Sequence, residues 1–237
     1  MAEQTTQQTT NNTVPAAAQP PNNTSPAVAQ LPKITDWPGA WEIYKYSKAA
    51  IMCNINTFVV LYLASIILNI PGFLRASNPN AVPYLLASLL SNLLLIVISI
   101  ATTVVYLAGV NNKKISVSES LKSISKYIVN YFIAIFIIGL AAFASILLFL
   151  IPAFFVIPRL VFAPYLVIDK NMGGVDAVQA SWNMSKGHVS KVYGIFGLTL
   201  AMTLLAITII GIPFAIYFTV MYSAAFAVLY NYVVNKK

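Results

Sequence analysis

The sequence predicts an all-α fold, a polytopic transmembrane helical bundle of six spans with cytoplasmic interfacial helices and a disordered N-terminal tail. Two observations predict it. Of the 237 residues, 59% are apolar and only 8% are charged, whereas soluble domains carry roughly 25% charged residues. The few charges also fall in clusters that long neutral stretches separate. Because so few charged side chains cannot cover a water-soluble surface, we expect lipid to cover most of this chain.

The first 35 residues form the predicted tail, ahead of a membrane domain over residues 36–237. The tail consists mainly of Gln, Thr, Asn, Ala and Pro, and its only charges are Glu3 and Lys33. Such a segment cannot bury enough apolar surface to offset the entropy lost on ordering. We therefore expect it to be disordered.

Four neutral stretches after the tail are apolar enough to enter a bilayer. The last of them, Val192–Asn235, has 44 residues and would be about 66 Å long as one helix. We therefore expect it to hold two spans, with a break at Gly211-Ile212-Pro213. Since a spanning helix needs about 20 residues, the predicted spans lie near Ile55–Leu74, Tyr84–Gly109, Tyr131–Leu150, Ala153–Ile168, Val192–Ile210 and Pro213–Val233.

The lysines predict how the chain is threaded. With six spans and both termini in the cytoplasm, 12 of the 14 Lys and Arg residues face the cytoplasm, the side where membrane proteins collect them. Arg75 then lies in an outer loop and Arg159 lies within the fourth span. That span is short and carries three prolines, so a re-entrant loop is the alternative. A re-entrant loop would place every lysine from Lys170 onward outside, against the charge rule.

A surface helix followed by a transmembrane hairpin is predicted to recur three times, near residues 37–112, 113–169 and 170–235. Each module begins with a residue suited to a helix N-cap three positions before a carboxylate, at Gly39–Glu42, Ser116–Glu119 and Gly173–Asp176. This pattern favours a helix start. Apolar residues at helical spacing follow, as expected of interfacial helices. The alternative to an internal repeat is that many cytoplasmic entries to membrane helices share this pattern.

Arg159 is the ionised residue that the prediction places within a span, where a charge costs about 2.5–3.5 kcal/mol on insertion scales. Its long side chain can reach the outer membrane surface, and we favour this interpretation. Alternatively, Arg159 lies in a pocket next to Pro158 and Pro164 and binds a lipid phosphate or an anionic solute. Lys186 and Lys191, which precede the fifth span, are further candidates for contact with a lipid or a solute.

Other polar residues predict structural roles. Asp169 ends the fourth span, where its carboxylate is placed to pair with Lys170 or Lys186, or to accept from free backbone N–H groups. We expect His188 to be solvated, and no metal site or cofactor is expected of a chain with one histidine and one cysteine. Asn92 with Ser88, and Thr199 with Thr203, are spaced to form hydrogen bonds between helices.

The run Phe162-Ala163-Pro164-Tyr165-Leu166-Val167-Ile168-Asp169, followed by Ala177, Ser181-Trp182 and Lys186-Gly187, resembles a bacterial six-helix membrane-protein family of unknown function. That family includes the membrane domain of glycerophosphoryl diester phosphodiesterases. The resemblance implies an integral protein of a prokaryotic plasma membrane. It does not imply hydrolysis, because the catalytic carboxylates and histidine pair are absent from this chain. The matching positions are Tyr165, Asp169, Ala177, Ser181, Lys186 and Gly187.

Three classes of function are compatible with these residues. The net charge of +8, spread over several cytoplasmic segments, predicts attraction to anionic lipid headgroups and no nucleic acid partner. We favour a non-catalytic membrane scaffold or regulator. Its expected partners, besides membrane lipids, are another membrane protein or a second copy of the chain. A transporter or lipid-handling protein is the alternative that Arg159 suggests. A membrane enzyme is the least favoured, because no catalytic constellation can be assembled from these residues.

Overall fold

The computed structural model describes residues 34, 36–77, 82–148, 151–208 and 211–235, and over these residues the chain is helical with no β-strand. The predicted tail lies outside the described residues except for Ile34, which packs against the core, so its disorder stays a prediction. Eleven helices follow one another along the described chain: α1 (Ile43–Cys53), α2 (Ile55–Ser77), α3 (Val82–Val110), α4 (Val117–Lys122), α5 (Ile124–Leu147), α6 (Ile151–Leu160), α7 (Ala163–Asp169), α8 (Gly174–Met184), α9 (Val189–Leu205), α10 (Gly211–Tyr222) and α11 (Ala225–Asn235).

Among the described residues, five segments are long and apolar enough to cross a membrane. They are Ile55–Leu74, Val82–Val110, Ile124–Leu147, Pro152–Asp169 and Gly211–Asn235. The predicted all-α fold with several apolar helices is therefore confirmed, and it is consistent with a multi-pass membrane protein. The predicted fifth span, Val192–Ile210, is not one of these five segments. Helix α9 has 17 residues, and it passes the same test only together with α8, to which it is bent by 97°. A sixth crossing therefore stays a proposal.

The three predicted helix starts have different outcomes. At α4 the prediction is confirmed, since Ser116 and Glu119 form a complete capping box. At α1 it is wrong, because residues 40–42 form a turn and the helix begins at Ile43, with Glu42 making no side-chain cap. At α8 the N-cap residue is Gly173, which has no side chain to accept a hydrogen bond, while Asp176 lies in the first turn as predicted and suits the helix dipole.

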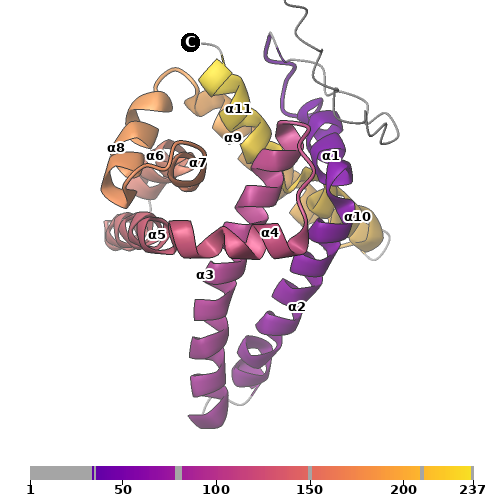
Figure 1. The fold of residues 1–237 in the computed structure, drawn as a ribbon, viewed down its shortest axis with the longest axis vertical. Coiled ribbons are helices and arrows are strands. Elements are labelled where there is room, and N and C mark those ends of the chain that lie inside the picture. The colour runs from indigo at the N-terminus through magenta and orange to yellow at the C-terminus, as the bar shows by residue number, and fades with distance from the viewer. Residues whose placement is uncertain (1–33, 35, 78–81, 149–150, 209–210, 236–237) are drawn as a thin grey trace, which may run out of the picture.

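The helices form hairpins that meet in one buried region. Figure 1 shows α2 and α3 side by side, extending away from the other helices. The main core brings together buried side chains of α1, α3, α5 and α7–α11, including Ile43, Ile100, Phe162, Ile195 and Leu229. A second cluster joins α1, α2 and α3. Here the chain backbones come very close, since a Cβ on Gly109 of α3 would lie 2.1 Å from the Ala50 carbonyl oxygen of α1.

Large apolar side chains are exposed where the hairpins extend beyond this core. On α2 and α3 they include Ile67, Phe73, Leu86 and Leu90, which are 61–74% exposed. The α5–α6 and α9–α10 hairpins show the same feature, at residues such as Phe143, Leu147, Phe154, Leu204 and Ile207. Apolar patches of this extent indicate a membrane or protein interface.

Candidate functional site

The fourth predicted span is broken between α6 and α7, and this break positions the candidate residues. Pro164 stands at the start of α7 and has no N–H to donate to the carbonyl four residues earlier. Ser181 of α8 forms hydrogen bonds to the backbone on both sides of Val161, in the break. Its hydroxyl donates to the Arg159 carbonyl at 2.7 Å and accepts from the Phe162 N–H at 3.2 Å. Since Ser181 is fully buried, these two bonds fix α8 against the break.

Arg159 is the last residue but one of α6, next to this junction, and its side chain is directed to α8. The guanidinium carbon lies 4.7 Å from the ring centroid of Trp182, well within cation–π range. Arg159 is half-buried, and within the described part of the chain it forms no ion pair, the one salt bridge there being Lys170 with Asp169. A guanidinium held on an indole with no carboxylate partner is suited to bind an anion.

The indole itself belongs to a face of α8 that is partly exposed among the described residues. Helix α8 buries its small residues Gly174, Ala177 and Ser181 against the bundle. Its larger apolar residues Val175 and Trp182 are 61% and 37% exposed. Of the apolar residues that the sequence predicts for the membrane surface on α8, Val175 and Trp182 are thus exposed, whereas Val178 packs against the main core.

Asp169 ends α7, and Tyr165 lies one turn before it on the same helix. The Tyr230 hydroxyl of α11 donates to Asp169 Oδ2 at 2.7 Å, and the Lys170 ammonium lies 3.1 Å from the same oxygen. Tyr165 stacks on Tyr230, with ring centroids 5.6 Å apart. Of the pairings left open by the sequence, the structure therefore shows Lys170, and it adds Tyr230. Together these contacts tie α7 to α11.

Gly187 and Ala177 have structural roles in the described fold. Gly187 has φ +81°, a left-handed conformation that favours glycine, and it lies in the turn where the chain bends from α8 to α9. Ala177 is fully buried in the main core. A larger side chain there would push α8 away from the bundle.

Lys186 lines a cavity of about 540 Å³, together with Leu166, Ala180, Asn183, Met184, His188 and Val233. This cavity combines apolar walls with a cationic side chain and two polar ones. Lys191 lies elsewhere, with its ammonium 6.0 Å from the Trp37 ring and 5.8 Å from the Tyr232 ring. The structure therefore does not bring Arg159, Lys186 and Lys191 together around a single cavity.

The sequence did not indicate several positions that hold the site and its surroundings together. The spacing places Trp182 in an apolar stripe, and nothing in that spacing indicates that it holds Arg159. Asn54 donates to the Lys113 carbonyl at 2.9 Å and accepts from the Ile115 N–H at 2.8 Å, which fixes the loop before α4.

The polar pairs in the spans also differ from the prediction. Asn92 and Thr203 donate to carbonyls of their own helices. Carbonyls one turn back are always within reach of such side chains. The predicted bonds between helices are therefore wrong for these two residues.

Comparison of the chain with protein-family models, with curated proteins and with solved structures finds no match in any of the three. The resemblance given by the Tyr165–Gly187 motif therefore stays a prediction. Support for a function comes from the geometry of this chain.

Proposed function

We propose that this chain is a non-catalytic membrane scaffold or regulator whose basic end binds anionic lipid headgroups. One observation carries the proposal: charge and apolar surface are segregated along the hairpins. The described lysines lie in and around α1, α4, α8 and the helix starts that follow them, whereas the described far ends of the α5–α6 and α9–α10 hairpins carry no charged residue. At the far end of the α2–α3 hairpin the one charged residue among those described is Arg75 of α2. A lipid bilayer is the medium that matches both surfaces.

The proposed topology has six crossings, with α8 at the inner membrane surface and α9 crossing beyond the bend. Two features support it. Val175 and Trp182 of α8 are exposed, and tryptophan favours the membrane interface. Trp37, near the start of the described chain, contacts Tyr232 of the last helix with ring centroids 5.5 Å apart. Contact between the two ends supports an even number of crossings, and the lysines favour the cytoplasm for both. The prokaryotic plasma membrane is the location that the family resemblance implies.

Lipid analysis tests the proposal. The protein is extracted in native-lipid discs, and mass spectrometry identifies the co-purified lipids and proteins. We expect anionic phospholipids to be enriched over their share of the whole membrane, since each lysine near a charged surface contributes about 1 kcal/mol. Lys186→Gln should lower that enrichment, and Arg75→Gln, in the predicted outer loop, is the control. A lipid composition equal to that of the bulk membrane would refute headgroup binding.

A second candidate function is lipid handling or transport, and it is favoured by Arg159 lying on Trp182 at a helix break. Transport predicts a flux of lipid or solute across proteoliposomes that contain the protein. Flux that persists at wild-type rate in Arg159→Gln would exclude Arg159 as the binding residue. Absence of flux over a broad panel of lipids and solutes leaves the scaffold as the better proposal.

A further inference from the structure

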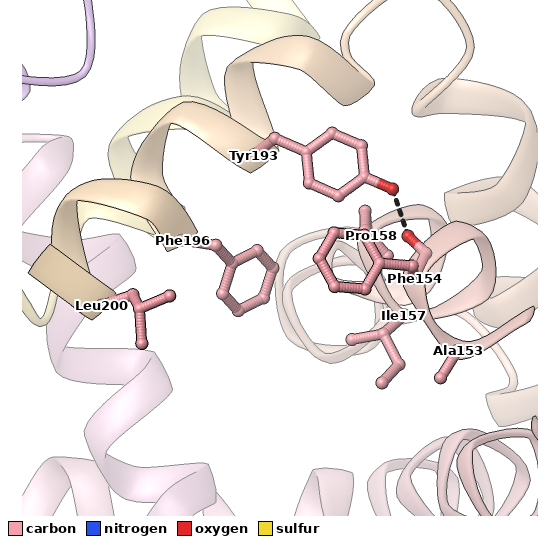
Figure 2. A pocket seen from close by; sticks show the side chains of 7 residues that line it. All are labelled: Ala153, Phe154, Ile157, Pro158, Tyr193, Phe196 and Leu200. Carbon is pink, nitrogen blue, oxygen red and sulfur yellow. Dashed lines mark hydrogen bonds between the residues drawn. The ribbon is translucent and has the colours of Figure 1, made fainter. Parts of the chain in front are cut away.

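The α6–α9 groove and the cavity at Lys186 differ in the groups that line them. The groove, drawn in Figure 2, is lined by Ala153, Phe154, Ile157, Pro158, Tyr193, Phe196 and Leu200. Among these side chains the one polar group is the Tyr193 hydroxyl, which donates to the Phe154 carbonyl oxygen. The groove therefore offers a ligand only apolar surface, and no group in it selects one occupant over another.

The cavity at Lys186, which we call the basic cavity, combines apolar and polar walls. Its volume is about 540 Å³, within the roughly 300–1,000 Å³ of small-molecule sites. The apolar walls are Leu166 of α7, Ala180 and Met184 of α8, and Val233 of α11, and the polar ones are Asn183, Lys186 and His188. A ligand that fits both kinds of wall has a charged or polar part joined to an apolar part.

Lys186 gives this cavity a positive charge that no carboxylate among the described lining residues offsets. Asp169, at the end of α7, is engaged by Lys170 and by the Tyr230 hydroxyl. The ammonium of Lys186 has no ion-pair partner within the described part of the chain. It can therefore bind an anion without giving up an existing ion pair.

His188 is held so that one ring nitrogen remains for a ligand. Its Nδ1 lies 3.3 Å from the Lys186 carbonyl oxygen. A carbonyl oxygen can only accept, so this hydrogen bond puts a proton on Nδ1, and Nε2 of the neutral ring is an acceptor. The Tyr232 ring of α11 packs edge-to-face with the imidazole, with centroids 6.4 Å apart. An acceptor fixed beside an ammonium suits a ligand that carries a hydroxyl near its negative charge.

The elements that line the basic cavity meet at the membrane surface that the proposed function assigns to the cytoplasm. Leu166 lies one turn before the end of α7, and Val233 lies two residues before the end of α11. Helix α8 is the proposed surface helix, and His188 directly precedes α9. In the six-crossing topology these are all cytoplasmic ends, so Lys186 lies at the depth of the inner-leaflet phosphates.

We propose that the basic cavity binds the headgroup of one anionic phospholipid of the inner leaflet, with Lys186 on the phosphate and His188 accepting from a headgroup hydroxyl. This rests on the proposed function and makes it specific, because it assigns one site and one class of headgroup to an attraction that the other lysines share. The apolar walls at Leu166 and Val233 contact the start of the acyl chains. The position at the membrane surface favours a lipid over a soluble phosphate ester of the same chemistry.

Photolabelling of the full chain in lipid discs tests the proposal. Three probes carry the same photoactivatable group near the glycerol end of one acyl chain and differ in the headgroup: phosphatidylglycerol, phosphatidylmethanol and phosphatidylcholine. Labelling of α8 and the turn after it is divided by labelling of α2, which reports lipid in general. We expect phosphatidylglycerol to give about tenfold the ratio of phosphatidylcholine, whose own cation opposes Lys186. Phosphatidylmethanol, which has the charge but no hydroxyl, should be intermediate.

Matched lysine variants separate the site from the general positive charge. Lys186→Gln should lower the preference for phosphatidylglycerol about fivefold, the upper factor expected for an exposed ion pair. Lys122→Gln on α4 removes the same charge outside the cavity and should leave the preference unchanged. Equal loss in the two variants would show attraction to the surface as a whole and overturn the proposal.

A second pair of variants, at exposed positions of α8, controls for misfolding. Asn183→Asp puts a negative charge in the cavity, and Gln179→Glu puts the same charge one turn earlier, outside the lining. Only Asn183→Asp should abolish the preference. In His188→Ala, phosphatidylglycerol and phosphatidylmethanol should label alike, and a retained difference between these two probes would overturn the hydroxyl contact.

A soluble competitor and variants that fill each hollow identify the occupant. Ala180→Trp fills the basic cavity and should remove the preference, whereas Leu200→Trp fills the α6–α9 groove and should keep it. Loss of labelling on addition of glycerophosphate would identify a soluble phosphate ester as the ligand and overturn the lipid. The anionic-lipid enrichment in native-lipid discs should persist in Ala180→Trp, because the other lysines remain. Enrichment without a cavity preference refutes this site alone, whereas absence of enrichment in the wild-type chain refutes the proposed function.

Discussion

Single residues hold the helix break in place, and Ser181 is the clearest case. Its hydroxyl donates to the Arg159 carbonyl of α6 and accepts from the Phe162 N–H just before α7. We predict that Ser181→Ala destabilises the protein by about 1–3 kcal/mol, because it leaves the buried Phe162 N–H without its partner. Thermal unfolding in lipid discs measures the change.

Ser185→Ala is the matched control for that experiment. Ser185 is also fully buried on α8, but its hydroxyl donates to the Trp182 carbonyl of its own helix. Its loss should cost less than the loss of Ser181. If the two variants unfold at the same temperature, Ser181 does not support the junction between α6 and α7.

Gly109 is a second residue that positions a helix. Because it has no side chain, α1 can pack directly against α3. A Cβ at this position would lie 2.1 Å from the Ala50 carbonyl oxygen, so Gly109→Ala must push α1 and α3 apart. We predict lower thermal stability, and a shift of α1. Gly139→Ala on α5 is the control, since a Cβ there meets no atom within 4 Å and alanine favours helix. Equal stability of the two variants would contradict the close approach of α1 and α3.

At the scale of elements, α4 has a cap that depends on pH. The hydrogen bond from the Ser116 backbone N–H, followed by that from its hydroxyl, lowers the pKa of Glu119 below its usual 4.5. Because the folded-state pKa is depressed, this stabilisation is fully present above pH 4.5 and is lost as the pH falls through the folded pKa. Hydrogen exchange at α4 amides, corrected for intrinsic rates, should show protection that falls over this range.

Two variants check the origin of that pH dependence. Glu119→Gln should abolish it, and Ser116→Ala should weaken α4 at every pH by about 0.5–2 kcal/mol, as expected for loss of an N-cap. A wild-type pH profile in Glu119→Gln would contradict the role of the carboxylate.

Helix α9 tests the number of crossings. It has 17 residues, about 25 Å at 1.5 Å per residue, which is short for a hydrocarbon core of about 30 Å. Under the six-span proposal, a cysteine at Thr208, in a Cys53→Ala background, reacts with a membrane-impermeant maleimide added to intact cells. A cysteine at His188 should react only after the cells are opened. The opposite pattern, or no reaction at either position in intact cells, would contradict a crossing by α9.

The sequence predicted elements well where a long apolar run determines the structure. The first span, Ile55–Leu74, appears with the predicted bounds, because about 20 uncharged and mostly apolar residues leave few alternatives to a helix. Short helices were predicted less well. After the helix start at Ser116, the spacing predicts one apolar stripe on a single surface helix, formed by Val117, Leu121, Ile124 and Ile128. The last two belong to α5, because α4 ends at Lys122. Local spacing does not determine where a helix ends when the same apolar pattern continues through the break.

The candidate site could be predicted only in part, because its geometry depends on contacts between distant segments. The sequence selected Arg159 from its charge, yet the favoured orientation towards the outer surface differs from the contact with Trp182. It also placed Asp169 near Lys170, which adjacency alone suggests, and did not indicate Tyr230, 61 residues away. The α6–α9 groove was out of reach, since no spacing within one helix shows how two hairpins face each other.

At the scale of the whole molecule, the proposed function depends on hydrocarbon covering the hairpins and on both chain ends lying on one side. The most direct test is protease protection of epitope tags at the two termini, compared between intact cells with a permeable outer barrier and inside-out vesicles. We predict that both tags are protected in the cells and both are cleaved in the vesicles. Tags that are cleaved on opposite sides of the membrane would contradict the threading and, with it, the proposed function.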